Sequence, residues 1–178
     1  MDINHFLAEP GKFNSLKKFE TKDDFGVDNK KEATAYMENY MEKMQGLQDR
    51  LYADNRYSLL LIFQAMDAAG KDGTIKAVMS GVNPAGCQVY SFKAPSQEDL
   101  DHDFLWRVQK TLPERGRIGI FNRSHYEEVL VVKVKPSFLD AQRLPRRPAT
   151  LDELWLERYE SIRDAELHWA RNGTVIVK

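Results

Sequence analysis

A short glycine-containing loop at residues 65–74, AMDAAGKDGT, carries the residue types best suited to chemistry in this chain. It follows the apolar run SLLLIF, a pattern that predicts a strand, a turn at Gly70 and Lys71, and then a helix. Such a turn aims several backbone N–H groups and the positive end of the helix dipole at one spot, which favours phosphate. We therefore predict that Lys71 binds phosphate together with Ala68, Ala69, Gly70, Asp72, Gly73 and Thr74. The alternative is an ordinary turn whose Asp caps the helix.

Two carboxylates in the same loop, Asp67 and Asp72, predict a metal ion. The usual phosphate-loop pattern G-x-x-x-x-G-K-[ST] would place Gly at position 65 and Ser or Thr at position 72, where this chain has Ala and Asp. Two acids in an anion-binding loop repel phosphate unless a hard cation lies between them. Carboxylates and phosphate oxygens are the usual ligands of Mg²⁺, so Mg²⁺ is the expected cofactor.

A second polar cluster, FNRSHYEE at residues 121–128, follows the apolar run RIGIF. It offers an amide, a guanidinium, a hydroxyl and a carboxylate at Asn122, Arg123, Ser124 and Glu127. In phosphoryl-transfer enzymes with a phosphate loop, a strand end of this kind supplies metal-binding or substrate-orienting groups. A plain helix start, with Ser124 as the cap and Glu127 as its capping-box partner, fits the same spacing.

The elements that must position these residues alternate between strand and helix. Expected strands lie at 59–63, 87–92, 117–121 and 174–178, and expected helices at 31–54, 74–79, 100–112, 124–134 and 151–171. Thr150 and Glu153 form a capping-box spacing before the last helix. The apolar side of helix 31–54 is expected to pack against the core through Met37, Tyr40, Met41, Met44, Leu47 and Leu51. This order predicts an α/β fold with a parallel sheet, helices on both faces, and ligands beyond the carboxyl ends of the strands.

Length and composition narrow the possible domain organisation and function of the chain further. Its 178 residues, 42% of them hydrophobic, suffice for one sizeable core, which we place at 31–178 after an irregular N-terminal arm at 1–30. The net charge of −1 argues against a broad nucleic-acid-binding face. A single cysteine, no signal-peptide pattern and no apolar run long enough for a membrane span together predict a cytoplasmic protein.

At the level of motifs, the chain resembles the family-2 polyphosphate kinases. The resemblance rests on AMDAAGKDGTIK, SGVNP, SFKAPS, DHDFLWR and LPERGRIGIFNRSHYEEVLVVKV, and it extends from about residue 31 to 178. The family's loop pattern G-x-D-x-x-G-K is matched at Asp67, Gly70 and Lys71. Its common F-D-R-S pattern reads FNRS here, so Asn122 stands where many members have Asp, and the NRSHYE form resembles class III members. The departure at Asn122 leaves a direct metal role to Asp67 or Glu127.

The resemblance implies a three-layer fold like that of phosphate-loop kinases, and reversible transfer of the terminal phosphoryl group of inorganic polyphosphate to AMP, ADP or both, with Mg²⁺. For that chemistry we assign catalysis to Asp67, Lys71 and Arg123, metal binding to Asp67 and Glu127, and contacts with the polyanion to Lys76 and Lys93. The resemblance also implies a homo-oligomer, and acceptance of guanine nucleotides stays open. Two rivals remain: an ATP-dependent small-molecule kinase, which would normally carry Ser or Thr at position 72, and a non-catalytic nucleotide- or polyphosphate-binding core.

One departure concerns the end of the chain. Related kinases continue into an arginine-rich lid and further helices, as the resemblance implies, whereas this sequence ends at the close of a candidate strand. We expect a correctly folded core with a site open to water, in which electrostatic contacts are weaker than in a closed one. Low activity is the expected consequence.

Overall fold

The computed structural model describes residues 7–8, 11, 26–27, 29–146 and 148–178. The chain forms two compact units, Met1–Tyr40 and Met41–Lys178. The expected irregular arm at 1–30 lies largely outside the described residues, and α1 begins at its end, spanning Lys30–Asp54. The second unit contains every strand found in the described part of the chain.

The second unit is built on a four-stranded parallel sheet in the order β2-β3-β1-β4. The strands are β1 (Ser58–Phe63), β2 (Cys87–Ser91), β3 (Ile118–Asn122) and β4 (Thr174–Val177). Phe63 and Ser91 both pair with Asn122, so β1, β2 and β3 end in the same row. The predicted parallel sheet is confirmed, and three carboxyl ends meet at one edge.

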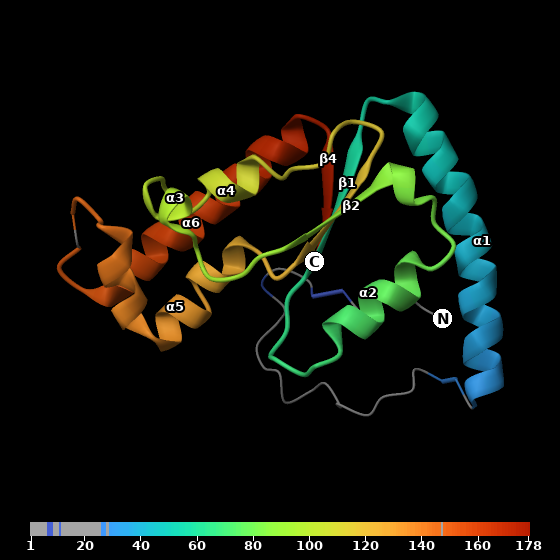
Figure 1. Cartoon of the computed structure of the whole chain (residues 1–178), viewed down its shortest axis with the longest axis horizontal. Coiled ribbons are helices and arrows are strands. Elements are labelled where there is room, and N and C mark those ends of the chain that lie inside the picture. The colour runs from blue at the N-terminus through green and yellow to red at the C-terminus, as the bar shows by residue number, and fades with distance from the viewer. Residues whose placement is uncertain (1–6, 9–10, 12–25, 28, 147) are drawn as a thin grey trace. The chain divides into compact units, whose positions relative to one another are not determined.

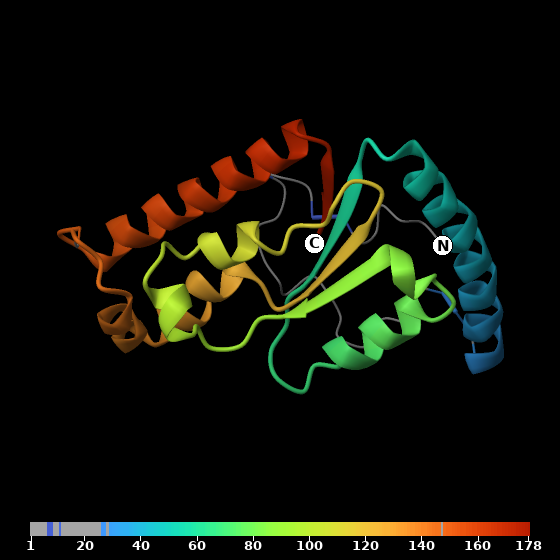
Figure 2. The ribbon, with the colours of Figure 1, turned by 45° about the horizontal axis from the view of Figure 1, so that its top comes forward.

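Helices cover both faces of this sheet. Figures 1 and 2 show α2 (Lys71–Met79) on one side of the strands, and α4 (Trp106–Gln109) and α6 (Leu151–Arg171) on the other. On the α2 side, Ile75 packs with Ile118 and Ile120. On the opposite side, Val108 and Trp169 pack against Leu60, Ile62 and Phe121. The predicted three-layer α/β fold is confirmed.

The long helices begin and end where the sequence indicates, but the apolar stripe of α1 was only partly right. In α6, Thr150 Oγ1 accepts from the Glu153 N–H at 3.2 Å, and the Glu153 carboxylate accepts from the Thr150 N–H at 3.3 Å, so the capping box is confirmed. In α1, Met44 and Leu51 pack against the core, whereas Met37, Tyr40 and Leu47 are exposed, Leu47 to 61%. Gln48 is buried in its place because its amide bonds both backbone groups of Asn83.

Two predicted helices were wrong. In the stretch 100–112, α4 is the one complete α-helix, and α3 (Gln97–Leu100) ends where the stretch begins. The Asp103 carboxylate accepts from the Leu105 N–H at 2.9 Å, a local bond that competes with a continuous helix. The stretch 124–134 forms a 3₁₀ turn, η4 (His125–Glu128), followed by α5 (Val131–Val134). Its valines lose side-chain freedom in a helix, which favours short pieces over a long one. Further 3₁₀ turns are η3 (Pro84–Gly86) and η5 (Pro136–Gln142).

Candidate active site

The loop between β1 and α2 passes twice through the left-handed region of backbone space. Gly70, at the N-terminus of α2, has a φ of 87°, and Ala68 has a φ of 62°. Glycine adopts this conformation without steric cost, so Gly70 suits the turn that opens the helix, whereas Ala68 carries strain of a kind that clusters at ligand sites. The first N–H groups of α2 have no acceptor within the helix. The loop therefore presents free donors and a helix N-terminus at one point, an arrangement suited to an anion.

Lys71 is the first residue of α2, and its side chain folds back over the loop. Its Nζ donates to the carbonyl oxygens of Ala65 and Met66, each at 2.9 Å. Both acceptors are neutral, so these bonds leave the positive charge of Lys71 available to an anionic ligand. Phosphate would gain a charge-assisted hydrogen bond there.

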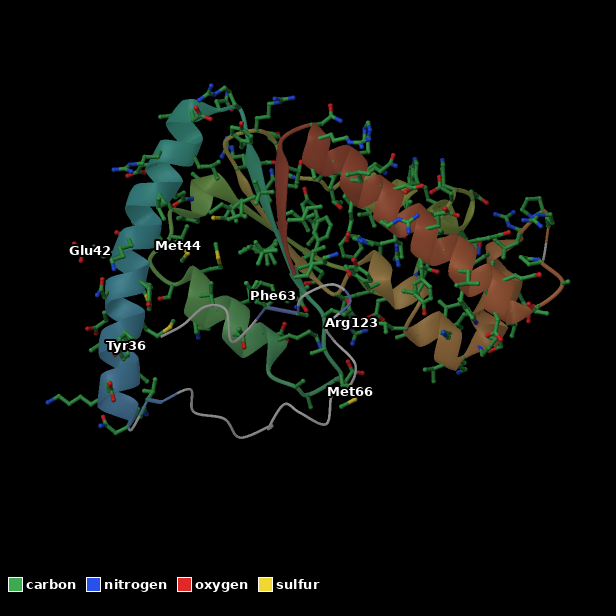
Figure 3. All side chains as sticks on the ribbon, turned by 180° about the vertical axis from the view of Figure 1, so that it is seen from behind. Tyr36, Glu42, Met44, Phe63, Met66 and Arg123 are labelled. Carbon is green, nitrogen blue, oxygen red and sulfur yellow. The ribbon has the colours of Figure 1, made fainter. Side chains whose placement is uncertain are left out.

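Two side-chain bridges join this loop to the residues that follow β3. The Arg123 guanidinium pairs with the Asp67 carboxylate, and Asn122 Nδ2 donates to Asp72 Oδ1 at 2.5 Å. Arg123 itself has a left-handed φ of 62°, and its N–H donates to the Phe63 carbonyl at 3.0 Å. The prediction that the two segments open onto one edge of the sheet is confirmed. Figure 3 labels Phe63, Met66 and Arg123 at this edge.

A cleft of about 590 Å³ lies at the edge where β1, β2 and β3 end. Most of the residues predicted from the sequence line it, namely Asp67, Ala68, Ala69, Gly70, Lys71, Asp72, Gly73, Lys93, Asn122 and Arg123. Ser91, Phe92 and Ala94, which the sequence reasoning did not select, line it too. The signal for them was the string SFKAPS at the end of the second strand. Three cationic side chains from three strand ends thus face one cleft.

Four predicted residues are absent from the lining of this cleft. Thr74 Oγ1 donates to the Gly70 carbonyl at 3.1 Å, and Lys76 lies on the exposed part of α2. Ser124 is fully buried and donates to Gln64 Oε1 at 3.1 Å, while Glu127 Oε1 accepts from Gln64 Nε2 at 2.5 Å. Gln64, which no sequence signal marked, thereby ties the end of β1 to the segment after β3.

The donor set of the cleft fits a hard divalent cation. Within the described residues no group of three or more His, Cys, Asp or Glu side chains is gathered as a metal site. Mg²⁺ does not require one, because it keeps several waters and binds one or two carboxylates together with substrate phosphates. Asp67 is 85% exposed and lines the cleft, and Asp72 lies beside it. Glu127 is engaged by Gln64, so Asp67 is the better placed of the two predicted ligands.

A second cavity, of about 650 Å³, lies beyond β2 between α3, α4 and α6. At its wall, Arg158 donates to Glu128 Oε2 at 3.0 Å, and both side chains are only 4% exposed. A smaller hollow shares Lys93 with the cleft and Arg107 with the second cavity. The three hollows are therefore neighbours, and Lys93 and Arg107 mark where they adjoin.

A buried polar network lies behind the segment after β3. Glu166 of α6 accepts hydrogen bonds from His125 Nε2 at 3.2 Å, from the Tyr126 hydroxyl at 2.6 Å and from Lys178 Nζ at 2.7 Å. Burial alone raises the pKa of the Glu166 carboxyl, but these three donors outweigh it and lower the pKa to about 2. Burial and the adjacent Glu166 raise the pKa of Tyr126 to about 12. At neutral pH, Glu166 is therefore an anion that accepts from three neighbours.

This network predicts acid sensitivity. The pKa of Glu166 lies below its ordinary value of 4.5, so the stability it contributes is present above pH 4.5 and is lost as the pH falls toward 2. The upper bound on the contribution of Glu166 to the free energy of unfolding is about 3 kcal/mol, taking ~1.4 kcal/mol per pKa unit. Urea unfolding at pH 7 and pH 3 should show a larger loss of unfolding free energy for the native chain than for Glu166→Gln. An equal loss in the two proteins would contradict this assignment.

In the described residues, no helix is long and apolar enough to cross a membrane. Curated relatives of the chain include the ADP-polyphosphate phosphotransferase of Rhodopseudomonas palustris, 51% identical over 97% of this chain and 60% of the relative. Another is the AMP/ADP-polyphosphate phosphotransferase of Meiothermus ruber, 42% identical over 99% of this chain and 62% of the relative. This chain therefore spans about three-fifths of the length of these relatives.

A solved structure and a family match agree with these relatives. The crystal structure of polyphosphate kinase 2 from Arthrobacter aurescens superposes with a TM-score of 0.82 at 35% identity, covering 94% of this chain and 57% of that one. The family described as Polyphosphate kinase 2 (PPK2) matches residues 27–178, which include the sheet, the loop and the segment after β3. Because its sequence and its fold agree, the chain belongs to the polyphosphate kinase 2 family.

Proposed function

We propose that this chain carries the catalytic core of a phosphotransferase that moves the terminal phosphoryl group of inorganic polyphosphate to AMP, ADP or both. The observation that carries the proposal is the convergence of Lys71, Arg123 and Lys93 with Asp67 on one cleft. Phosphoryl transfer needs positioning and neutralisation of charge rather than a covalent nucleophile. Cations from three strand ends around a helix N-terminus meet that need. The names of the relatives, which act on polyphosphate and adenine nucleotides, support the same reaction.

Each residue has a role that follows from its chemistry. Lys71 and the N–H groups at the start of α2 hold the transferring phosphoryl group. Arg123 stabilises the charge that develops on it, because a planar guanidinium donates to phosphate oxygens in pairs. Lys93, at the end of β2, binds a further phosphate of the chain. Asp67 leaves its pairing with Arg123 when phosphate takes its place on the guanidinium, and its carboxylate is then free for a cation.

We propose Mg²⁺ as that cation, with Asp67 as its principal protein ligand. Glu127, the second ligand predicted from the sequence, would first have to leave its hydrogen bond with Gln64. When bound, the ion neutralises phosphate charge and aligns donor and acceptor oxygens. Asn122, bonded to Asp72, keeps that carboxylate oriented at the start of α2. The chain's own contribution is to keep these groups fixed before the substrates arrive.

The acceptor nucleotide needs a surface for its nucleoside as well as a place for its phosphates. We propose that its phosphates lie in the cleft and that its nucleoside reaches along Lys93 toward the second cavity. The buried Arg158–Glu128 pair and the aromatic ring of Phe104 line that cavity, so it offers both hydrogen-bonding and apolar surface. A relative from Mycolicibacterium smegmatis is named a GDP-polyphosphate phosphotransferase, so guanine nucleotides belong in the test.

Initial rates of nucleotide formation test the proposed function. The chain would be incubated with polyphosphate, Mg²⁺ and AMP, ADP, GMP or GDP in turn, and the products separated by chromatography. We expect ADP from AMP or ATP from ADP, with polyphosphate as the required donor. Product formed from ATP and a small-molecule acceptor, with none from polyphosphate, would favour the ATP-dependent kinase instead. Binding of polyphosphate with no product from any acceptor would favour a binding core.

A further inference from the structure

Arg123, the residue that faces Asp67 across the cleft, holds a backbone conformation that needs support. Its φ of 62° lies in the left-handed region of backbone space. Residues other than glycine keep this conformation only where the surrounding structure fixes them. On its amino side, the Arg123 N–H donates to the Phe63 carbonyl at 3.0 Å. On its carboxyl side the chain enters a fully buried pair, Ser124 and His125. Contacts that fix Ser124 and His125 therefore also fix the position of the Arg123 guanidinium.

Glu166 supplies such contacts on the side away from the cleft. One carboxylate oxygen accepts from both His125 Nε2 and the Tyr126 hydroxyl, and the other accepts from Lys178 Nζ, which also donates to the Tyr126 hydroxyl at 2.7 Å. The Glu166 side chain is 13% exposed and His125 is 1% exposed. A single carboxylate thus joins α6, the end of β4 and the segment after β3.

His125 depends on this carboxylate for its hydrogen bonding. Its Nδ1 is the one buried side-chain nitrogen or oxygen without a hydrogen-bond partner among the described residues, so Nε2 makes the only hydrogen bond of the ring. The ring also packs edge-on against Trp169, with centroids 5.6 Å apart, and its centroid lies 4.7 Å from that of the Tyr126 ring. Loss of the Glu166 acceptor therefore leaves the ring held by packing alone.

We propose that Glu166 is a positioning residue for the phosphate site: its carboxylate fixes His125 and Tyr126 and thereby holds Arg123 in the left-handed conformation that presents its guanidinium to the cleft. Glu166 contacts neither Arg123 nor the cleft, so it acts through the backbone of the segment 123–126. The consequence for catalysis rests on the proposed function, whereas the effect on the segment itself does not.

Hydrogen exchange and kinetics test the two parts separately. In Glu166→Gln, one amide oxygen replaces the two carboxylate oxygens that serve three donors in the native chain, and the negative charge is lost. The amides of the segment 123–126 should therefore exchange at least tenfold faster than in the native chain, while the β1 amides keep their protection. The matched control is Glu160→Gln on the same helix, where an exposed carboxylate pairs with the exposed Arg163. Unchanged exchange in the segment of a folded Glu166→Gln would overturn the proposal. Tyr126→Phe, which removes one of the three donors and keeps the ring, provides the same readout if Glu166→Gln fails to fold.

A double-mutant cycle with Arg123→Ala tests the link to turnover. Alone, Glu166→Gln should lower kcat/KM for polyphosphate about tenfold, since small displacements of a charge-stabilising group have effects of this size. In the Arg123→Ala background the same change should cost less than twofold, because the group being positioned is gone. An equal loss in both backgrounds would mean that Glu166 acts on the fold in general, and would overturn the proposal. Absence of turnover in the native chain, with faster exchange in Glu166→Gln, would refute the proposed function and leave the positioning role standing.

Discussion

Lys71→Ala is expected to lower the rate of phosphoryl transfer about 10³-fold. Among the described residues, the hydrogen bonds of Lys71 Nζ go to two neutral carbonyls, so its charge is available to the transferring group. Removing a preorganised donor at a developing charge costs about 3–4 kcal/mol in comparable sites, which corresponds to a factor of 10²–10³. Because Lys71→Ala removes a full positive charge, we expect the fall in rate to lie at the upper end of this range.

The fold should tolerate this change. Lys71 is the first residue of α2, and alanine is a good helix former, so the free energy of unfolding should change by less than about 0.5 kcal/mol. Lys135→Ala is the matched control, because Lys135 is exposed beyond α5 and lines neither the cleft nor the second cavity. Equal activity of the two variants, measured by nucleotide formation at saturating substrate, would remove Lys71 from the mechanism.

Asp67→Asn is expected to separate chemistry from binding. The substitution removes the carboxylate that pairs with Arg123 and that we assign to Mg²⁺, and it leaves a side chain of the same shape. Turnover should fall at least 10²-fold, and the Mg²⁺ concentration for half-maximal activity should rise. Binding of tripolyphosphate without metal, measured by calorimetry, should be unchanged or tighter, because a negative charge has left an anion-binding cleft.

Asp164→Asn provides the control for this experiment, since Asp164 is an exposed residue of α6 beside Arg163. If the chain is a non-catalytic binding core, Asp67→Asn should still bind tripolyphosphate, and the native chain itself should show no turnover. Native-level turnover in Asp67→Asn, with the same Mg²⁺ requirement, would assign the metal elsewhere, and Glu127 would then be the next residue to replace.

The sequence was sufficient to predict the sheet edge, because its evidence is local. Apolar runs indicate strands, Gly70 and Lys71 indicate the turn, and strand ends of a parallel sheet must meet. Nothing comparable marked Gln64 or Glu166, because their partners in the segment after β3 lie about 40 to 60 positions away in the chain and are adjacent only in the fold. The exposure of Leu47 escaped prediction for a related reason. Periodicity indicates which side of a helix faces inward, but the two bonds of Gln48 to Asn83 decide which residue is buried there.

The divided helices reflect a competition that periodicity does not detect. The spacing of Leu100, Phe104, Val108 and Leu112 fits one helical face, yet Asp103 bonds the backbone two residues on and interrupts the helix. Aspartate offers the backbone such an alternative wherever it occurs, and the outcome depends on the packing around it. Here the interruption lies at the second cavity, whose wall includes Asp103 and Phe104.

The most direct measurement is the fate of labelled phosphorus. Polyphosphate labelled with ³²P would be incubated with the native chain, Mg²⁺ and unlabelled AMP or ADP, alongside Lys71→Ala. We expect label in the terminal phosphate of ADP or ATP with the native chain and only traces with the variant. Label that stays in polyphosphate, or appears only as inorganic phosphate, would contradict phosphoryl transfer from polyphosphate to a nucleotide.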